Sequence, residues 1–130
     1  GLVDFDVVDH TNLHRQIAHA ASDEGRAKVH SLCDTILAGN SNIEVEVHNI
    51  RLERENVLEL FGQYDIIADG SDNFETRYLI NDAAYFTKKP LVSASIFRFQ
   101  GQITIFDPES GGPCYRCLYS EPPPAALVPS

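Results

Sequence analysis

The chain has few positive charges. Its 130 residues include 10 lysines and arginines against 19 aspartates and glutamates, which gives a formal net charge of -9 at pH 7 with neutral histidines. Such a chain repels a phosphate polymer unless a strong local basic patch overcomes the repulsion. We therefore expect no nucleic-acid partner.

Long uncharged apolar stretches are also absent. No run approaches the roughly 18 residues that indicate a membrane-spanning helix. The first residues carry Asp4, Asp6 and Asp9 where a secretion signal would have basic and then apolar residues. We expect a soluble, cytoplasmic protein with no membrane segment. Hydrophobic residues make up 43% of the chain, which is enough for a single domain to bury a core.

The chain begins without a methionine and contains no G-x-G-x-x-G sequence, although it has 8 glycines. An apolar segment at residues 1–6 opens the chain with no predicted structure before it. At the other end, a proline-rich stretch leads to Ser130 without a closing element. We therefore expect these residues to be an incomplete piece of a longer protein.

Apolar patterning predicts strands that alternate with helices. Segments with the apolar content or alternation of strands are residues 1–6, 43–47, 64–68 and 91–95. Segments with helical spacing and plausible caps lie between them, at residues 23–40, 57–62 and 72–89. This order predicts an α/β, Rossmann-like fold, with a mostly parallel sheet and helices on both faces. Residues 101–105 follow too closely for a helical crossover, so this last strand should be antiparallel.

Candidate nucleotide-binding residues follow the first predicted strand. An acidic residue at such a strand end, here Asp4, can accept hydrogen bonds from both ribose hydroxyls; the alternative is an ordinary solvated carboxylate. The loop from Thr11 to Gln16 is rich in polar groups, and its Arg15 suits bidentate contact with phosphate. Lys28 lies near the predicted start of a helix, where the helix dipole disfavours a cation. Its side chain therefore either reaches away to an anion or stays there at a small energetic cost.

A second candidate loop, Asp69-Gly-Ser-Asp72-Asn73, follows the buried strand at 64–68. A carboxylate at a strand-to-helix turn, such as Asp72, can hold Mg²⁺ between nucleotide phosphates. The alternative is that Asp72 or Asn73 is only the N-cap of the next helix. Arg77, one turn later, is placed to pair with Asp72 or Asp69.

The 3 cysteines include one close pair, Cys114 and Cys117, directly after a glycine-rich turn. This spacing supplies half of a tetrahedral zinc site, whose other ligands would come from outside the nearby sequence. A redox dithiol is the alternative, but such pairs usually open a helix that follows a strand, and this one leads into a proline-rich segment. Cys33 falls in an apolar helical stripe and is expected in the core.

Several segments, in order along the chain, resemble the ubiquitin-activating-type adenylyltransferases, most closely the sulfur-carrier adenylyltransferases of the molybdopterin and thiamine pathways. They are Asp4-Phe-Asp6 with Asn12-Leu-His-Arg15-Gln16, Gly25-Arg-Ala-Lys28, Asp69-Gly-Ser-Asp72-Asn73 with Arg77 and Asn81, Pro90-Leu-Val-Ser-Ala-Ser95, Gly101-Gln-Ile-Thr, and Gly112-Pro-Cys-Tyr-Arg-Cys117. The resemblance covers essentially the whole chain.

The resemblance implies ATP-dependent adenylylation of the C-terminal Gly-Gly carboxylate of a ubiquitin-like sulfur-carrier protein, which gives an acyl-adenylate and pyrophosphate. It also implies residue roles: Asp4 on the ribose; Thr11, Asn12, Leu13, His14, Arg15 and Lys28 near the phosphates; Asp72 with Asn73 at Mg²⁺; and Cys114 and Cys117 as the first half of a four-cysteine Zn²⁺ site. The implied catalytic residues are Arg15, Lys28 and Asp72, and a homodimer is expected.

Two parts of the family pattern are missing from these residues, namely the glycine-rich loop before the Asp4 strand and the second cysteine pair. The resemblance therefore implies that residues 1–130 are a partial adenylyltransferase domain without its first β-α unit. Residues 107–130 would begin the zinc knuckle and a proline-rich crossover segment. We expect this piece alone to be inactive.

Two other functions share the predicted fold. A nicotinamide-dependent oxidoreductase also has a parallel sheet with an acidic strand end. A non-catalytic partner of an activating enzyme would keep the fold without the chemistry. The presence of Arg15, Lys28 and Asp72 together favours phosphoryl chemistry over both.

Overall fold

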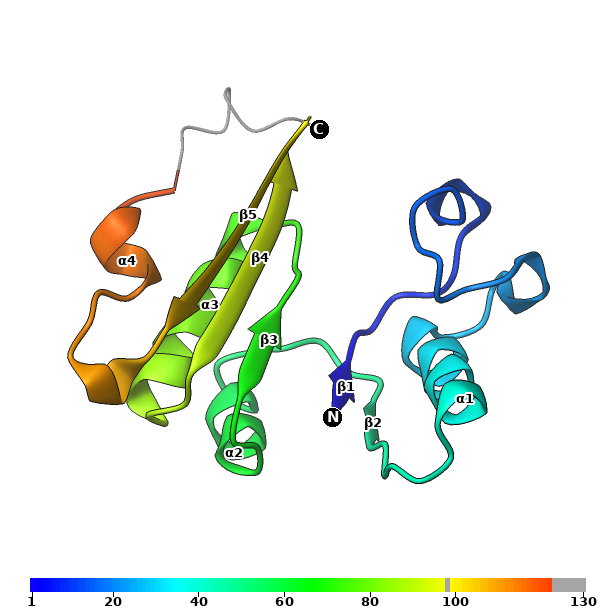
Figure 1. The fold of residues 1–130 in the computed structure, drawn as a ribbon, viewed down its shortest axis with the longest axis horizontal. Helices are drawn as coiled ribbons and strands as arrows, with labels where there is room; N and C mark the ends of the chain where they lie inside the picture. The colour runs from blue at the N-terminus through cyan, green and yellow to red at the C-terminus, as the bar shows by residue number, and fades with distance from the viewer. Residues whose placement is uncertain (98, 123–130) are drawn as a thin grey trace. The chain divides into compact units, whose positions relative to one another are not determined.

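The computed structural model describes residues 1–97 and 99–122. The chain forms two compact units, Gly1–Leu52 and Glu53–Ser130, each with its own strands and helices (Figure 1). The end of the predicted proline-rich segment, residues 123–130, lies outside the described residues. No described helix combines the length and the apolar character needed to cross a membrane.

The first unit is built on a short parallel pair of strands, β1 (Leu2–Val3) and β2 (Val47–His48), with Leu2 opposite Val47. Helix α1 (Lys28–Gly39) joins the two strands and packs against both. This arrangement confirms the predicted β-α-β unit. β2 shares only Val47 with the strand predicted at 43–47 and extends to His48, because its ladder with β1 covers just two residue pairs.

Helix α1 begins later than predicted, because Asp23 is not its N-cap. Asp23 ends a 3-10 turn, η2 (Ala21–Asp23), where its carboxylate accepts the N–H of Ala20 at 2.9 Å. The chain then turns at Gly25, whose φ of 82° lies in the left-handed region that favours glycine. The helix starts at Lys28 after the N-cap Ala27, and it ends at Gly39, as the sequence indicates.

The second unit contains a three-stranded sheet in the order β3-β4-β5. β3 (Ile67–Asp69) is parallel to β4 (Leu91–Phe97), and β4 is antiparallel to β5 (Gln100–Phe106). The link between β4 and β5 is too short for a helical crossover, which explains the change of direction. The predicted α/β class, with parallel pairing and an antiparallel strand near the C-terminus, is confirmed.

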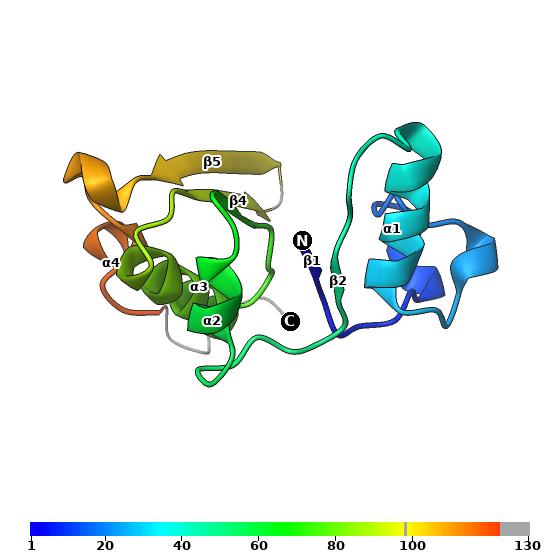
Figure 2. The ribbon, with the colours of Figure 1, turned by 90° about the horizontal axis from the view of Figure 1, so that it is seen from below.

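The helices of the second unit are α2 (Val57–Gly62), α3 (Phe74–Phe86) and α4 (Tyr115–Leu118), with a 3-10 turn, η3 (Pro108–Ser110), after β5. Figure 2 shows α2, α3 and α4 on one face of the sheet. The apolar core of this unit includes Leu60, Phe61, Ile67, Ile80, Leu91 and Phe106. Helix α3 follows β3 and leads into β4, so its first turn lies just beyond the carboxyl end of β3.

Candidate functional site

The loop after β3 shows which of Asp72 and Asn73 is the N-cap of α3. Asn73 is the N-cap of α3, and its side-chain oxygen accepts the N–H of Thr76 at 2.9 Å. Asp72 is exposed, and within residues 1–97 and 99–122 no hydrogen bond or ion pair engages its carboxylate. The capping role therefore belongs to Asn73, and Asp72 remains available to a ligand.

Arg77 ties the carboxyl end of β3 to Ala94, in the middle of β4. Its side chain is only 10% exposed and lies 3.9 Å from the carboxylate of Asp69, which is 2% exposed. The guanidinium also donates to the carbonyl of Ala94 at 3.2 Å and to the carbonyl of Ser71. Of the two predicted partners of Arg77, the structure selects Asp69.

In the first unit, Asp4 follows β1 and is half-buried. Its Oδ1 accepts the N–H of Asp6 at 2.8 Å, and its own N–H donates to the carbonyl of His48 at 3.3 Å. These bonds turn the chain sharply after the strand. They also place Asp6 beside Lys28.

Lys28 is the first residue of α1 and reaches an anion rather than being merely tolerated there. Its Nζ lies 2.9 Å from Oδ2 of Asp6, and its side chain is 14% exposed. Its backbone N–H donates to the carbonyl of Asp6 at 2.9 Å. The segment after β1 is thereby tied to the start of α1 at two points.

The predicted phosphate loop forms a compact 3-10 turn, η1 (His10–Asn12). Asp9 is its N-cap and accepts both the hydroxyl and the N–H of Thr11. The Thr11 hydroxyl, followed by the Thr11 N–H, lowers the pKa of Asp9 below its ordinary value. Arg15 is exposed and donates to the carbonyl of Thr11 at 3.0 Å. Of the remaining predicted residues in this loop, Asn12 and Leu13 are half-buried and His14 is exposed.

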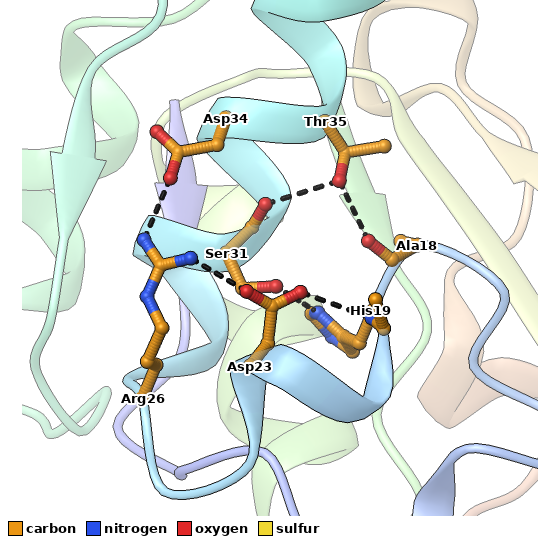
Figure 3. A network of polar contacts seen from close by, with 8 residues as sticks. Ala18, His19, Asp23, Arg26, Ser31, Asp34 and Thr35 are labelled. Atoms are coloured by element: carbon orange, nitrogen blue, oxygen red, sulfur yellow. Dashed lines mark hydrogen bonds and ion pairs between the residues drawn. The ribbon is translucent and has the colours of Figure 1, made fainter.

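A polar network joins the end of this loop to α1 (Figure 3). Arg26 bridges Asp23 and Asp34, with both N–O distances at 2.6 Å. Ser31, which is 1% exposed, lies with its hydroxyl 2.7 Å from Nδ1 of His19. These contacts hold the chain segment that separates Arg15 from Lys28 against the helix.

The cysteine pair lies at the start of α4. Cys114 is the N-cap of this helix, and its sulfur is 3.7 Å from the sulfur of Cys117. Burial raises the pKa of the Cys114 thiol. Hydrogen bonds from the backbone N–H and thiol of Cys117, the N–H of Arg116 and the amide of Asn81 outweigh burial and leave that pKa below its ordinary value. The pair opens a short helix, but the 3-10 turn η3 and a glycine turn, and not a strand, come directly before it.

Helix α4 is fastened to α3 by side-chain contacts that the sequence did not predict. The guanidinium of Arg116 forms two hydrogen bonds with Asp82, at 2.6 and 2.7 Å, and lies 4.6 Å from the centre of the Tyr78 ring. Asn81, 3% exposed, accepts the N–H of Tyr115 at 2.8 Å. Asp82 and Arg116 are far apart in the sequence, so no local spacing signals their pairing.

The predicted site residues fall into two groups. Asp4, Thr11, Asn12, Leu13, His14, Arg15 and Lys28 belong to the first unit, and Asp72, Asn73, Cys114 and Cys117 belong to the second. Across the described residues, no group of three or more His, Cys, Asp and Glu side chains is arranged to hold a metal ion.

A model of the ThiF family matches residues 1–130. The chain is 53% identical over 133 residues to the probable adenylyltransferase/sulfurtransferase MoeZ of Mycobacterium tuberculosis, and the match covers 100% of this chain and 34% of that protein. It is 49% identical over 128 residues to the adenylyltransferase and sulfurtransferase MOCS3 of Danio rerio, with 98% of this chain and 28% of that protein covered. The chain thus spans about a third of the length of these curated relatives.

Solved structures share the fold at lower sequence identity. A crystal structure of E. coli MccB with ATP superposes with a TM-score of 0.77 at 23% identity, over 88% of this chain and 34% of that chain. The crystal structure of PaaA gives a TM-score of 0.71 at 24% identity, over 87% of this chain and 37% of that chain.

We expect Asp82→Asn to lower the free energy of unfolding at neutral pH by roughly 1 kcal/mol or less, since the Arg116 pair is partly exposed. Hydrogen bonds from Arg116 outweigh burial and hold the pKa of Asp82 below its ordinary value. The pair therefore stabilises the fold above the ordinary carboxyl pKa of about 3.9, and that stability is lost as pH falls through the lower, folded-state pKa.

Urea unfolding of wild type and variant between pH 7 and pH 3 measures this effect. The difference in unfolding free energy should be largest at neutral pH and shrink in acid. Asp65→Asn, which changes an exposed carboxylate before β3, is the matched control and should have little effect. A difference that does not vary with pH would contradict the assignment.

Proposed function

The chain belongs to the ThiF family, and from this premise we propose that the full-length protein is an ATP-dependent adenylyltransferase acting on a ubiquitin-like sulfur-carrier protein. The carboxylate of the carrier's terminal Gly-Gly would attack the α-phosphorus of ATP, forming an acyl-adenylate and releasing pyrophosphate. The observation that carries the proposal is the 53% identity, along the whole chain, with a protein named as an adenylyltransferase/sulfurtransferase. Residues 1–130 would be a partial adenylyltransferase domain, inactive alone, in which residues 107–130 begin the zinc knuckle and crossover.

The first unit would contribute the groups that hold the nucleotide. Asp4 is proposed to accept the ribose hydroxyls, and Thr11 to Arg15 to approach the phosphates. Arg15 donates to one carbonyl, so most of its five N–H donors remain for phosphate. The ammonium of Lys28 is already oriented by Asp6 at 2.9 Å. This contact supports the proposed role of Lys28 as a fixed cation beside the negative charge that develops on the phosphates.

The second unit would contribute the magnesium ligand. We assign this role to Asp72, because Asn73 is already engaged as the cap of α3. An exposed carboxylate oxygen is a ligand type that suits Mg²⁺. The bound ion would offset negative charge on the phosphates while two anions are brought together. The attacking carboxylate is already ionised, so positioning and electrostatic stabilisation account for catalysis without a protein base.

Cys114 and Cys117 are proposed as half of a structural zinc site. Two thiolates on a tetrahedral zinc, with Zn–S bonds of about 2.3 Å, lie about 3.8 Å apart. The observed sulfur–sulfur distance of 3.7 Å fits this arrangement and exceeds the roughly 2.05 Å of a disulfide. The other two ligands would come from beyond the described residues. A dithiol remains the alternative outcome of the test below.

The partners would be the sulfur carrier and a second copy of the enzyme, and the acidic chain disfavours nucleic acid. Membership in the ThiF family supports adenylyl transfer over the nicotinamide-dependent alternative. The non-catalytic alternative predicts that Arg15, Lys28 and Asp72 can be replaced without loss of activity, which the following substitutions test.

We expect Asp72→Ala in the full-length enzyme to abolish carrier-dependent pyrophosphate exchange while the fold survives. The reason is that the change removes a metal ligand and breaks no contact among the described residues. Exchange of labelled pyrophosphate into ATP measures the effect. Asp65→Ala, at the opposite end of β3, should behave like wild type. Exchange by Asp72→Ala near the wild-type rate would remove Asp72 from the magnesium site.

Arg15→Ala and Lys28→Ala should each depress kcat by roughly 100-fold or more, with a smaller effect on KM for the carrier. Charge on the transferred group grows in the transition state, so a lost donor costs most there. Steady-state kinetics with varied carrier separates the two parameters, and Arg54→Ala, an exposed arginine, is the control. Changes confined to KM for the carrier would instead assign Arg15 and Lys28 to docking.

The full-length enzyme should contain about one zinc per subunit, and Cys114→Ser with Cys117→Ser should remove it. In the double variant, stability and zinc content should fall while nucleotide affinity changes little, because the metal is assigned a structural role. Metal analysis by mass spectrometry and thermal unfolding measure both quantities. Cys33→Ser should retain zinc. A zinc-free wild-type enzyme, or a double variant with unchanged stability and zinc content, would indicate an ordinary turn or a dithiol.

A further inference from the structure

The loop that carries Asp72 is fixed from one side by the buried guanidinium of Arg77. Both backbone polar groups of Ser71 are engaged: its N–H donates to Oδ1 of Asp69 at 2.8 Å, and its carbonyl accepts from Arg77. On the other side of Asp72, the capping bond of Asn73 fixes the start of α3. Asp72 thus has a constrained backbone on both sides and a carboxylate that no described residue engages.

Stability alone is a poor explanation for this arrangement. The Arg77–Asp69 pair is 3.9 Å apart and almost fully buried. Removing two charges from water costs about as much as such a pair returns, so an apolar pair would serve stability as well or better. The donors of Arg77 instead bridge two backbone carbonyls, of Ser71 in the loop and of Ala94 in β4. Only a planar, forked cation has donors placed to make both contacts and keep the charge opposite Asp69.

We propose that Arg77 is a positioning residue that sets the 70–73 loop so that the Asp72 carboxylate meets Mg²⁺ bound with ATP. This inference rests on the proposed function, because it assumes the magnesium role of Asp72. Arg77 itself acts through the backbone of Ser71. Loss of a residue that orients a metal ligand typically weakens metal binding by roughly 10- to 100-fold.

The test is Arg77→Lys in the full-length enzyme, which keeps the charge opposite Asp69 but removes the fork. Isothermal titration of ATP with and without Mg²⁺ should show that the magnesium-dependent part of the affinity falls roughly 10- to 100-fold, while affinity without magnesium is unchanged. Arg116→Lys is the matched control, because this arginine binds a carboxylate in the same unit away from the loop. It should leave both affinities at wild-type values.

A double-variant cycle separates positioning from general destabilisation. Because Arg77 acts through Asp72, adding Arg77→Lys to Asp72→Ala should cause no further loss of magnesium-dependent binding. Additive losses, or wild-type binding by Arg77→Lys, would overturn the proposal. If Arg77→Lys does not fold, Asp69→Asn with Arg77→Gln removes both buried charges and should show the same loss.

These binding readouts are independent of the carrier reaction. A wild-type enzyme that binds ATP with Mg²⁺ but shows no carrier-dependent exchange would refute the proposed reaction and leave the role of Arg77 to be decided by the cycle. A wild-type enzyme whose ATP affinity does not respond to Mg²⁺ would overturn the positioning role.

Discussion

One hydrogen bond, from the N–H of Thr76 to the side chain of Asn73, fixes the start of α3, and the candidate chemistry of the second unit depends on it. Because Asn73 supplies the cap, the carboxylate of Asp72, just beyond β3, has no partner in the part of the chain that the structure describes. One turn later, Arg77 ties the same loop to β4. A further turn along the helix, Asn81 holds the cysteine turn.

Helix α3 therefore carries or contacts the residues of both candidate sites in the second unit. Its first turn faces the end of a parallel strand, where α/β folds gather ligands. Its middle anchors α4, so the two thiols at 3.7 Å are arranged by side chains of a helix rather than by a loop alone. In the first unit, the link between Asp6 and Lys28 has the same effect, since it joins the end of β1 to the start of α1.

Local patterns were sufficient to predict the order of strands and helices as far as the antiparallel β5, and a helix cap at Asp72 or Asn73, because each depends on neighbouring residues. They did not decide which of these two residues is the cap. The sequence does not show which of several nearby groups a polar side chain will bind. Asp23 has the chemistry of an N-cap but is bound by Ala20 and Arg26 instead. The pairing of Arg116 with Asp82 depends on how α4 packs against α3, and no spacing in the sequence indicates it.

The central claim, that the full-length protein adenylylates a carrier terminus, is tested most directly by exchange of labelled pyrophosphate into ATP with two forms of one candidate carrier. We expect exchange with the intact ubiquitin-like carrier and none with a carrier that lacks its terminal Gly-Gly, because that carboxylate is the attacking group. Exchange that is the same with both forms, or absent with every sulfur carrier tried, would contradict the account.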